Sequence, residues 1–358
     1  MQKFAARLKA VGNYIFVDGM SGMALGLFAT LIIGTIIEQI GKLIGGNIGT
    51  MVSLCAAVVK ALTGAGIGIG VAIKFKDAPL VSISAAGAGM VGAFSSQLLA
   101  ASTAVNGGLF LKGPGEPLGA FIAVLVAVSV GRLVSGKTKI DILVTPFVTI
   151  VSGSIAGLLV GPPISRFMAW LGELVVLGTE LQPILMGIVV SVLMGIILTL
   201  PISSAALGVA MNLTGLAAGA ATIGCCANMV GFAVASFREN KWNGLFAQGL
   251  GTSMLQVPNL MKKPVLWIPP VLASAILGPI ATAVFGMTNS AIGSGMGTSG
   301  LVGQIATLQT MTADHSLWYV FLLIAVMHFI LPAALSLLFS EIMRKLGWIK
   351  DGDLKLDI

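Results

Sequence analysis

The stretch LKGPGEPLGAF, residues 111–121, places one carboxylate, Glu116, among three glycines and two prolines. Glycine and proline disfavour a regular helix, which leaves backbone donors and acceptors free to surround a polar ligand. A carboxylate can accept hydrogen bonds from the hydroxyl groups of a sugar. Glu116 is therefore the leading candidate for a solute-binding residue. The alternative is an exposed loop with an ordinary charge.

A second set of candidates consists of uncharged polar residues in the later part of the chain. Amide side chains and hydroxyl groups offer both hydrogen-bond donors and acceptors, which suits a hydroxylated or zwitterionic solute. The same groups also serve as interhelical hydrogen bonds in membrane proteins. The candidates are Asn228, Asn289, Ser294, Thr298 and Gln304.

His328 is the lone histidine within an apolar run, LLIAVMHFILP. A histidine at this place could relay protons, and the alternative is a buried neutral ring bonded to a helix carbonyl. No pair of nucleophile and base and no spacing typical of metal ligands occurs in the sequence. The sequence therefore predicts no catalytic residue, no metal and no cofactor, and it makes an enzyme the least favoured class of function.

Other acids have simpler explanations. Asp77, in KFKDAPL, is expected in a polar turn that pairs with Lys74 and Lys76. Asp351 and Asp353 lie in the charged segment at residues 347–358 and are expected to be solvated.

The elements that must position these residues are membrane helices. Of 358 residues, 56% are hydrophobic and 9% are charged, and the mean hydropathy is +1.02. About a quarter of the residues in a soluble domain are charged. The apolar runs at residues 118–130 and 184–200 are continuous, which indicates helices rather than alternating strands. We predict an all-α polytopic membrane protein with about 8–10 transmembrane helices.

Glycine gathers at residues 64–70, 85–94 and 291–303. Small residues let membrane helices approach closely. The last cluster, in TNSAIGSGMGTSGLVGQ, is too rich in glycine and hydroxyl residues for a stable continuous helix. It is typical of a re-entrant or broken helix, which transporters use to direct helix ends toward a substrate.

The chain divides by pattern into six parts. A weak repeat, with GMVGAF echoed by NMVGFA, suggests two related halves, although such matches of small residues also arise by chance. The residues between the halves follow a helical apolar stripe, which fits a connector along the membrane or a plain surface helix. The expected parts are an amphipathic segment at 1–18, a first membrane half at 19–161, an amphipathic connector at 162–182, a second membrane half at 183–310, a transmembrane helix at 311–346 and a cytoplasmic tail at 347–358.

The net charge of +7 is interpreted as membrane topology, with no nucleic-acid partner. Basic residues cluster near Lys3, Arg132, Arg238, Lys262 and Arg344. By the positive-inside rule these clusters mark cytoplasmic segments. We predict a multi-pass protein of the cell membrane with both termini in the cytoplasm.

Several stretches resemble the membrane subunit IIC proteins of the sugar phosphotransferase system, particularly the branch that includes perfringolysin-regulator-like proteins. The stretches are GMALGLFATLIIGTIIEQIG, APLVSISAAGAGMVGAF, PGEPLGAFIAVLVAVSVGRLVSGKTKIDILVTP and LPISSAALGVAMNL. The resemblance implies a homodimer in which a substrate-carrying domain moves like an elevator against a scaffold domain.

The resemblance also bears on Glu116. Sugar-transporting members carry a Gly-x-x-Glu-Pro-like sequence whose glutamate bonds sugar hydroxyls, and Gly113, Glu116 and Pro117 match it. The match lies early in this chain, whereas the transporters carry theirs late. The family's transport also needs a phosphoryl donor, which here would be a separate cytoplasmic protein.

Two functions from different classes follow. The first is a transporter of a small polar solute, a sugar or hydroxylated organic acid, which works by elevator-type alternating access. The second is a membrane sensor that binds a solute and signals to a cytoplasmic regulatory partner without net transport. Net flux through the purified protein separates them.

Overall fold

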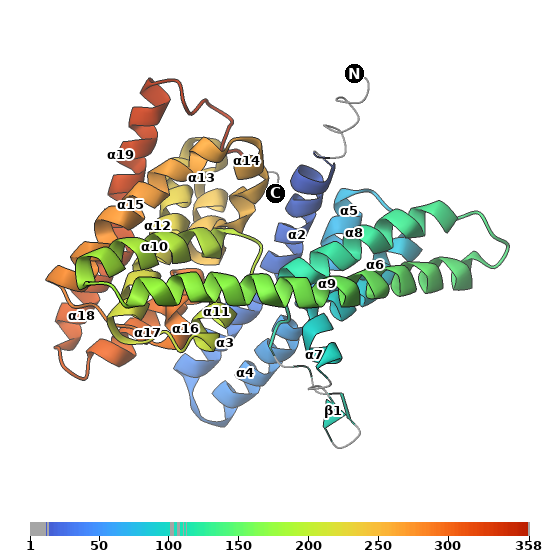
Figure 1. The fold of residues 1–358 in the computed structure, drawn as a ribbon, viewed down its shortest axis with the longest axis horizontal. Coiled ribbons are helices and arrows are strands. Elements are labelled where there is room, and N and C mark those ends of the chain that lie inside the picture. The colour runs from blue at the N-terminus through green and yellow to red at the C-terminus, as the bar shows by residue number, and fades with distance from the viewer. Residues whose placement is uncertain are drawn as a thin grey trace. The chain divides into compact units, whose positions relative to one another are not determined.

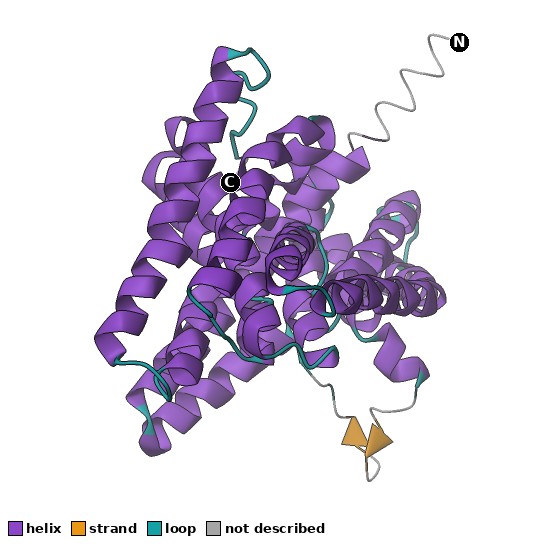
Figure 2. Ribbon diagram, turned by 60° about the vertical axis from the view of Figure 1, so that its left-hand side comes forward, coloured by secondary structure: helices purple, strands orange, loops and turns teal. Residues whose placement is uncertain are grey.

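The structure is a computed structural model that describes residue 12 and residues 14–100, 104–105, 108–109, 111 and 113–356. The described chain is almost entirely helical (Figure 2). It divides into two compact units, with the boundary between Phe167 and Met168. The prediction of an all-α membrane protein is confirmed. Most of the segment predicted as amphipathic, residues 1–18, lies outside the described residues.

Unit 1 holds the earlier elements (Figure 1). They are η1 (Tyr14–Gly19), α2 (Met20–Leu27), η2 (Phe28–Ile32), α3 (Ile33–Ile44), α4 (Gly46–Ala61), α5 (Thr63–Lys74), α6 (Pro79–Ala93), α7 (Ser95–Leu99), the paired antiparallel strands β1 (Ala104–Val105) and β2 (Gly108–Leu109), α8 (Pro117–Val134) and the first part of α9 (Asp141–Thr179).

Unit 2 holds the remaining elements. They are the end of α9, α10 (Pro183–Thr199), α11 (Ser204–Ala210), α12 (Gly215–Ala235), α13 (Phe237–Phe246), η3 (Ala247–Gly251), η4 (Ser253–Gln256), α14 (Val257–Lys262), η5 (Pro264–Trp267), α15 (Ile268–Pro279), η6 (Ile280–Val284), α16 (Ala291–Ser294), η7 (Ser299–Leu301), α17 (Val302–Met311), α18 (Leu317–Ile324), η8 (Ala325–Ile330) and α19 (Leu331–Lys345).

Six helices of the described chain are long and apolar enough to cross a membrane, or seven if the pair α4 and α5, bent by 49°, is one span. Two shorter apolar helices, α6 and α10, accompany them. The six are Tyr14–Ile44, Pro117–Val134, Asp141–Thr179, Gly215–Ala235, Pro264–Val284 and Leu317–Lys345.

Helix α9 continues through the segment predicted as a connector. It runs for 39 residues and contains Pro146, Pro162 and Pro163. Proline removes a backbone hydrogen bond from a helix interior, but membrane helices tolerate it where neighbouring groups satisfy the freed carbonyl. The boundary between the two units falls within this helix.

Glycine contacts pack the helices of unit 1. A Cβ built on Gly26 of α2 would lie 2.2 Å from the carbonyl oxygen of Gly66 on α5. One built on Gly92 of α6 would lie 2.6 Å from the oxygen of Gly119 on α8. The backbones of these helices therefore touch, as small residues allow in membrane bundles.

Unit 2 is built around α12, which packs against α10, α15 and α19. Nearly the whole of α12 is buried. A Cβ built on Gly224 of α12 would lie 1.8 Å from the carbonyl oxygen of Ser191 on α10. No side chain larger than hydrogen fits there without displacing a backbone.

The charged tail after α19 is anchored on unit 2. The side chains of Ile349 and Leu354 are buried in a cluster with Phe232 and Met343. Gln256 Nε2 donates to the Leu354 carbonyl oxygen at 3.0 Å. Buried apolar side chains and paired backbone groups therefore hold the tail in place.

The tail acids differ from expectation. Asp351 is exposed and pairs with Arg344 at 2.9 Å, and Asp353 pairs with Lys263 at 2.6 Å. Burial alone would raise the pKa of Asp353, but hydrogen bonds from Lys263 and from the Lys350 backbone N–H outweigh it and lower the pKa below its ordinary value. The prediction that Asp353 is merely solvated is wrong, because tail and α14 meet here.

Candidate functional site

Glu116 lies at the start of α8, immediately before Pro117. Gly113 and Gly115 both have positive φ, +75° and +76°, which glycine adopts without steric cost. The Glu116 backbone N–H donates to the carbonyl oxygen of Ala93 at 2.7 Å. A Cβ built on Gly115 would lie 2.7 Å from the Cβ of Ala93. The backbone around the carboxylate is therefore fixed against the end of α6.

A helix break lies beside Glu116. The path from α6 to α7 turns at Phe94, whose φ of −105° and ψ of 12° are not helical. Ser95 Oγ, on α7, donates to the Gly92 carbonyl oxygen at 2.9 Å. Ser96 Oγ lies 2.7 Å from Ser165 Oγ on α9. Hydroxyl groups thus line the same end of α6 that holds Glu116.

The electrostatics at this place favour a negative charge. The N-terminus of a helix carries a partial positive charge, so a carboxylate there is stabilised. The side chain of Glu116 is half-buried. A half-buried carboxylate on a backbone held against α6 has the chemistry to accept hydrogen bonds from a polyol.

The other six predicted residues belong to unit 2, whereas Glu116 belongs to unit 1. All six are buried, and all border α12 or belong to it. The residues are Asn228, Asn289, Ser294, Thr298, Gln304 and His328.

Asn289 joins the glycine-rich segment to α12. Its Nδ2 lies 2.7 Å from Thr222 Oγ1, 3.0 Å from Thr307 Oγ1 and 3.1 Å from the Gly303 carbonyl oxygen. Its Oδ1 accepts from the Ser290 backbone N–H at 2.7 Å. Every polar atom of this amide therefore has a partner within the protein.

Asn228 makes a second cluster farther along α12. Its Nδ2 donates to the Gly224 carbonyl oxygen at 3.1 Å and to Ser274 Oγ at 3.3 Å. Thr199 Oγ1 donates to its Oδ1 at 3.4 Å. These bonds connect α10, α12 and α15.

The glycine-rich segment between α16 and α17 is a broken helix, as expected. Gly297, Gly300 and Leu301 all have positive φ. A Cβ built on Gly297 would lie 2.7 Å from the Cβ of Cys225. The segment therefore lies directly on α12.

The two hydroxyl candidates in this segment bond to backbone groups. Ser294 Oγ donates to the Ala291 carbonyl oxygen at 2.9 Å. Thr298 Oγ1 donates to the Gly249 carbonyl oxygen and approaches Met229 Sδ at 3.5 Å. In this conformation both hydroxyl groups have their donors engaged within the protein.

Gln304 and His328 form the exception. Gln304 Nε2 lies 3.0 Å from His328 Nδ1 and 3.4 Å from Cys226 Sγ. Among the described residues, Gln304 Oε1 is buried without a hydrogen-bond partner. If the amide rotated by half a turn, its oxygen would accept from the ring and the thiol, and the amino group would lack acceptors. In both orientations one buried group of this amide is unmatched.

The sequence did not single out several partners in these networks. Thr222 and Cys226, four residues apart on α12, meet Asn289 and Gln304. Their spacing places them on one helical face, but a threonine and a cysteine are common packing residues in membrane helices. The other missed partners are Thr199, Ser274 and Thr307.

An ion cluster in unit 1 was also not foreseen in full. Arg132 on α8 pairs with Asp77 and donates to Tyr14 Oη at 2.6 Å. Its guanidinium also lies over the rings of Tyr14 and Phe75, which are stacked. Asp77 was predicted in a polar turn with Lys74 and Lys76, and the structure adds that its side chain is buried and pairs with Arg132.

No group of three or more His, Cys, Asp or Glu residues that could hold a metal ion occurs in the described part of the chain. The candidate residues are a set of neutral donors and acceptors in unit 2 and the half-buried carboxylate of Glu116 in unit 1. Both arrangements suit recognition of an uncharged polar solute.

Comparison with known protein families identifies one family. The family described as "Phosphotransferase system, EIIC" matches residues 17–356. No curated protein matches the chain. With nearly its whole length matched, the chain belongs to the EIIC family of the phosphotransferase system and is a sugar-transporter-like membrane subunit.

Proposed function

We propose that this chain binds a small hydroxylated solute, a sugar or a hydroxylated organic acid, at Glu116 and carries it across the membrane. The observation that carries the proposal is the fixed backbone at Glu116. Gly115 packs on Ala93 and the Glu116 N–H bonds the Ala93 carbonyl oxygen. A rigidly placed carboxylate keeps its hydrogen-bonding geometry between cycles, which lowers the entropic cost of binding.

Alternating access in this proposal is of the elevator type. The supporting features are the division into two compact units and the helix breaks at Phe94 and at residues 295–301. Broken helices line substrate sites in transporters whose parts move as bodies. We further propose a homodimer with both termini in the cytoplasm.

The polar residues of unit 2 have a defined place in the proposal. Asn228, Asn289, Ser294, Thr298 and Gln304 stay predicted solute contacts, and in this conformation their side chains form hydrogen bonds within the protein. His328 is the proposed proton relay, and its buried Nδ1 lies 3.0 Å from Gln304 Nε2. Membership in the family implies cooperation with other phosphotransferase components, and a separate cytoplasmic phosphoryl donor is the proposed partner.

The test compares Glu116→Gln with the native protein in proteoliposomes, after a thermal-shift screen of sugars and hydroxy acids has given a ligand. A ligand that binds the native state raises its melting temperature. We expect Glu116→Gln to lose solute binding and exchange while it keeps the melting temperature of the native protein without ligand. The matched control is Glu173→Gln, at an exposed position of α9.

Two outcomes would overturn parts of the proposal. Unchanged exchange in Glu116→Gln would remove Glu116 from the site. Saturable binding by the native protein with no exchange across the bilayer would favour the sensor function over transport.

A further inference from the structure

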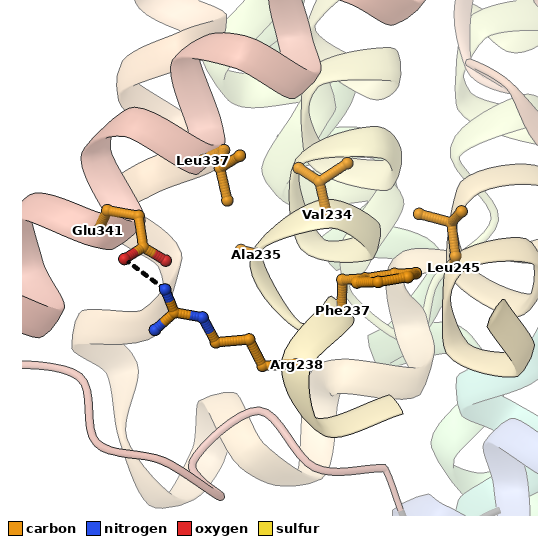
Figure 3. A pocket seen from close by; sticks show the side chains of 7 residues that line it. All are labelled: Val234, Ala235, Phe237, Arg238, Leu245, Leu337 and Glu341. Atoms are coloured by element: carbon orange, nitrogen blue, oxygen red, sulfur yellow. Dashed lines mark hydrogen bonds and ion pairs between the residues drawn. The ribbon is translucent and has the colours of Figure 1, made fainter. Parts of the chain in front are cut away.

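A pocket of about 530 Å³ lies at one end of unit 2, between α19 and the α12–α13 corner (Figure 3). Its wall is mostly apolar, formed by Val234, Ala235, Phe237, Leu245 and Leu337. Arg238 and Glu341 also line it, and Figure 3 shows their ion pair beside the apolar side chains. The volume falls within the range of about 300–1,000 Å³ that holds small ligands.

The pocket continues the lipid-facing surface of α19. Leu337 is 43% exposed, and Leu338 and Ile342 beside it are also exposed. In a helix that crosses the membrane, exposed leucine and isoleucine meet acyl chains. An apolar chain can therefore pass from the bilayer along α19 into the pocket without crossing a polar surface.

Charged side chains of both signs lie at this end. Arg238 is bound to Glu341 through Nη2 at 2.9 Å, and its side chain is 60% exposed. Lys241 and Lys345 are exposed and follow Arg238 by three residues and Glu341 by four, and Arg344 pairs with Glu239. A planar guanidinium offers five N–H donors, and a phosphate group can accept from several of them. The single contact with Glu341 uses only one nitrogen of Arg238.

Aromatic residues indicate the depth of this end in the membrane. Trp242 and Phe246 on α13 are both exposed and stack on each other. Exposed aromatic side chains next to basic residues are typical of the boundary between acyl chains and headgroups. The pocket thus has an apolar interior and, at its mouth, an exposed arginine paired with one glutamate.

We propose that this pocket binds one anionic phospholipid, with an acyl chain along Leu337 and Phe237 and its phosphate on Arg238 in place of Glu341. Glu341 closes the mouth in the absence of lipid and competes with the phosphate for the guanidinium. This proposal is independent of the solute site, because none of its residues belongs to that site.

The test uses the full chain in nanodiscs of phosphatidylcholine with a minor fraction of phosphatidylglycerol, followed by native mass spectrometry of the retained lipids. We expect the native protein to retain phosphatidylglycerol preferentially. Arg238→Gln should lower its retention about fivefold, the change that corresponds to about 1 kcal/mol for one basic side chain at an anionic membrane surface. Glu341→Gln should raise retention, because the competing carboxylate is gone.

Two further variants test the pocket and the charge separately. Leu337→Trp fills the acyl path and should lower retention with Arg238 intact. Arg166→Gln removes an exposed arginine outside the pocket and should leave retention unchanged. Melting temperatures in pure phosphatidylcholine identify any variant that is misfolded.

Three results would overturn the proposal. Equal loss in Arg238→Gln and Arg166→Gln would indicate nonspecific surface charge. Equal retention of the two lipids by the native protein would show that the pocket is an apolar groove without selectivity for an anionic headgroup. A shift from dimer to monomer in Leu337→Trp would assign the groove to a second copy of the chain.

Discussion

The two polar regions of the molecule are built in opposite ways. At Glu116 in unit 1, backbone contacts to Ala93 fix the position and the side chain is left half-buried. Around α12 in unit 2, side chains bond to one another, and Asn289 and Asn228 have all their groups paired. A site held by backbone can present its side chain to a solute, whereas a site held by side chains stabilises helix packing first.

The largest expected effect concerns the backbone at Glu116. Gly115→Ala places a Cβ 2.7 Å from the Cβ of Ala93 at a φ of +76°. The positive φ costs about 1–2 kcal/mol and the overpacking about 1–3 kcal/mol more. Gly113→Ala is the matched control, since its φ is +75° but its Cβ would meet open space.

The measurement is denaturation together with solute binding. We expect Gly115→Ala to lose both stability and binding, and Gly113→Ala to lose only about 1–2 kcal/mol. If the two variants behave alike, the contact with Ala93 does not fix the site, and the contrast between the regions fails.

The next effect concerns Asn289. Asn289→Ala leaves the acceptors Thr222, Thr307 and Gly303 without their shared donor, and a buried unsatisfied group costs about 1–3 kcal/mol. We expect a lower melting temperature as the larger effect, and a weaker affinity for solute in the fraction that stays folded, since Asn289 is also a predicted solute contact. Asn47→Ala, at an exposed position, is the control. An unchanged affinity would remove Asn289 from the solute site and leave it a packing residue.

The pair of Gln304 and His328 gives a smaller effect with a clear sign. Gln304→Leu alone leaves His328 Nδ1 buried without its partner and should cost about 1–3 kcal/mol. The double variant with His328→Leu removes both polar side chains. It should recover most of that loss, because neither position then holds a buried polar group without a partner. Chemical denaturation of the three proteins checks this. Unchanged pH dependence of exchange in the double variant would exclude the proton relay.

The fold class could be predicted from the sequence, because long apolar runs and low charge are properties of composition. The place of Glu116 at a helix break could also be predicted, since the glycines and prolines around it interrupt a helix. It could not give the partners of the buried amides, because Thr222 and Cys226 meet Asn289 and Gln304 only through tertiary packing. The repeat, the domain limits and the dimer stay predictions.

One local error has a physical reason. Asp353 was expected to be solvated in a charged segment, yet the neighbouring Leu354 and Leu356 are buried. A short segment in which leucines alternate with charged residues does not predict which helices those leucines will pack against.

The smallest effect is the pH response of the tail, where a partly exposed ion pair contrasts with the buried networks. The folded pKa of Asp353 is depressed, so its stabilising contribution is present above the unfolded pKa of about 3.9 and is lost as the pH falls below it. An ion pair of this exposure contributes about 1 kcal/mol or less. We expect Trp348 fluorescence to change below about pH 4 in the native protein and not in Asp353→Asn. The same change in both proteins would assign the response to another group.

The hydrogen bonds that α12 makes with both earlier and later helices have a consequence for biogenesis. Helix α12 carries Thr222 and Asn228 into the membrane, and their partners lie on α10, which precedes it, and on α15 and the glycine-rich segment, which follow. A nascent chain that stops after α12 therefore lacks Ser274, a partner of Asn228, and Asn289, the partner of Thr222. We expect chains truncated before α15 to be degraded faster than chains truncated after α17, which pulse-chase labelling in cells would measure. Equal lifetimes would show that α12 is stable in the membrane before unit 2 is complete.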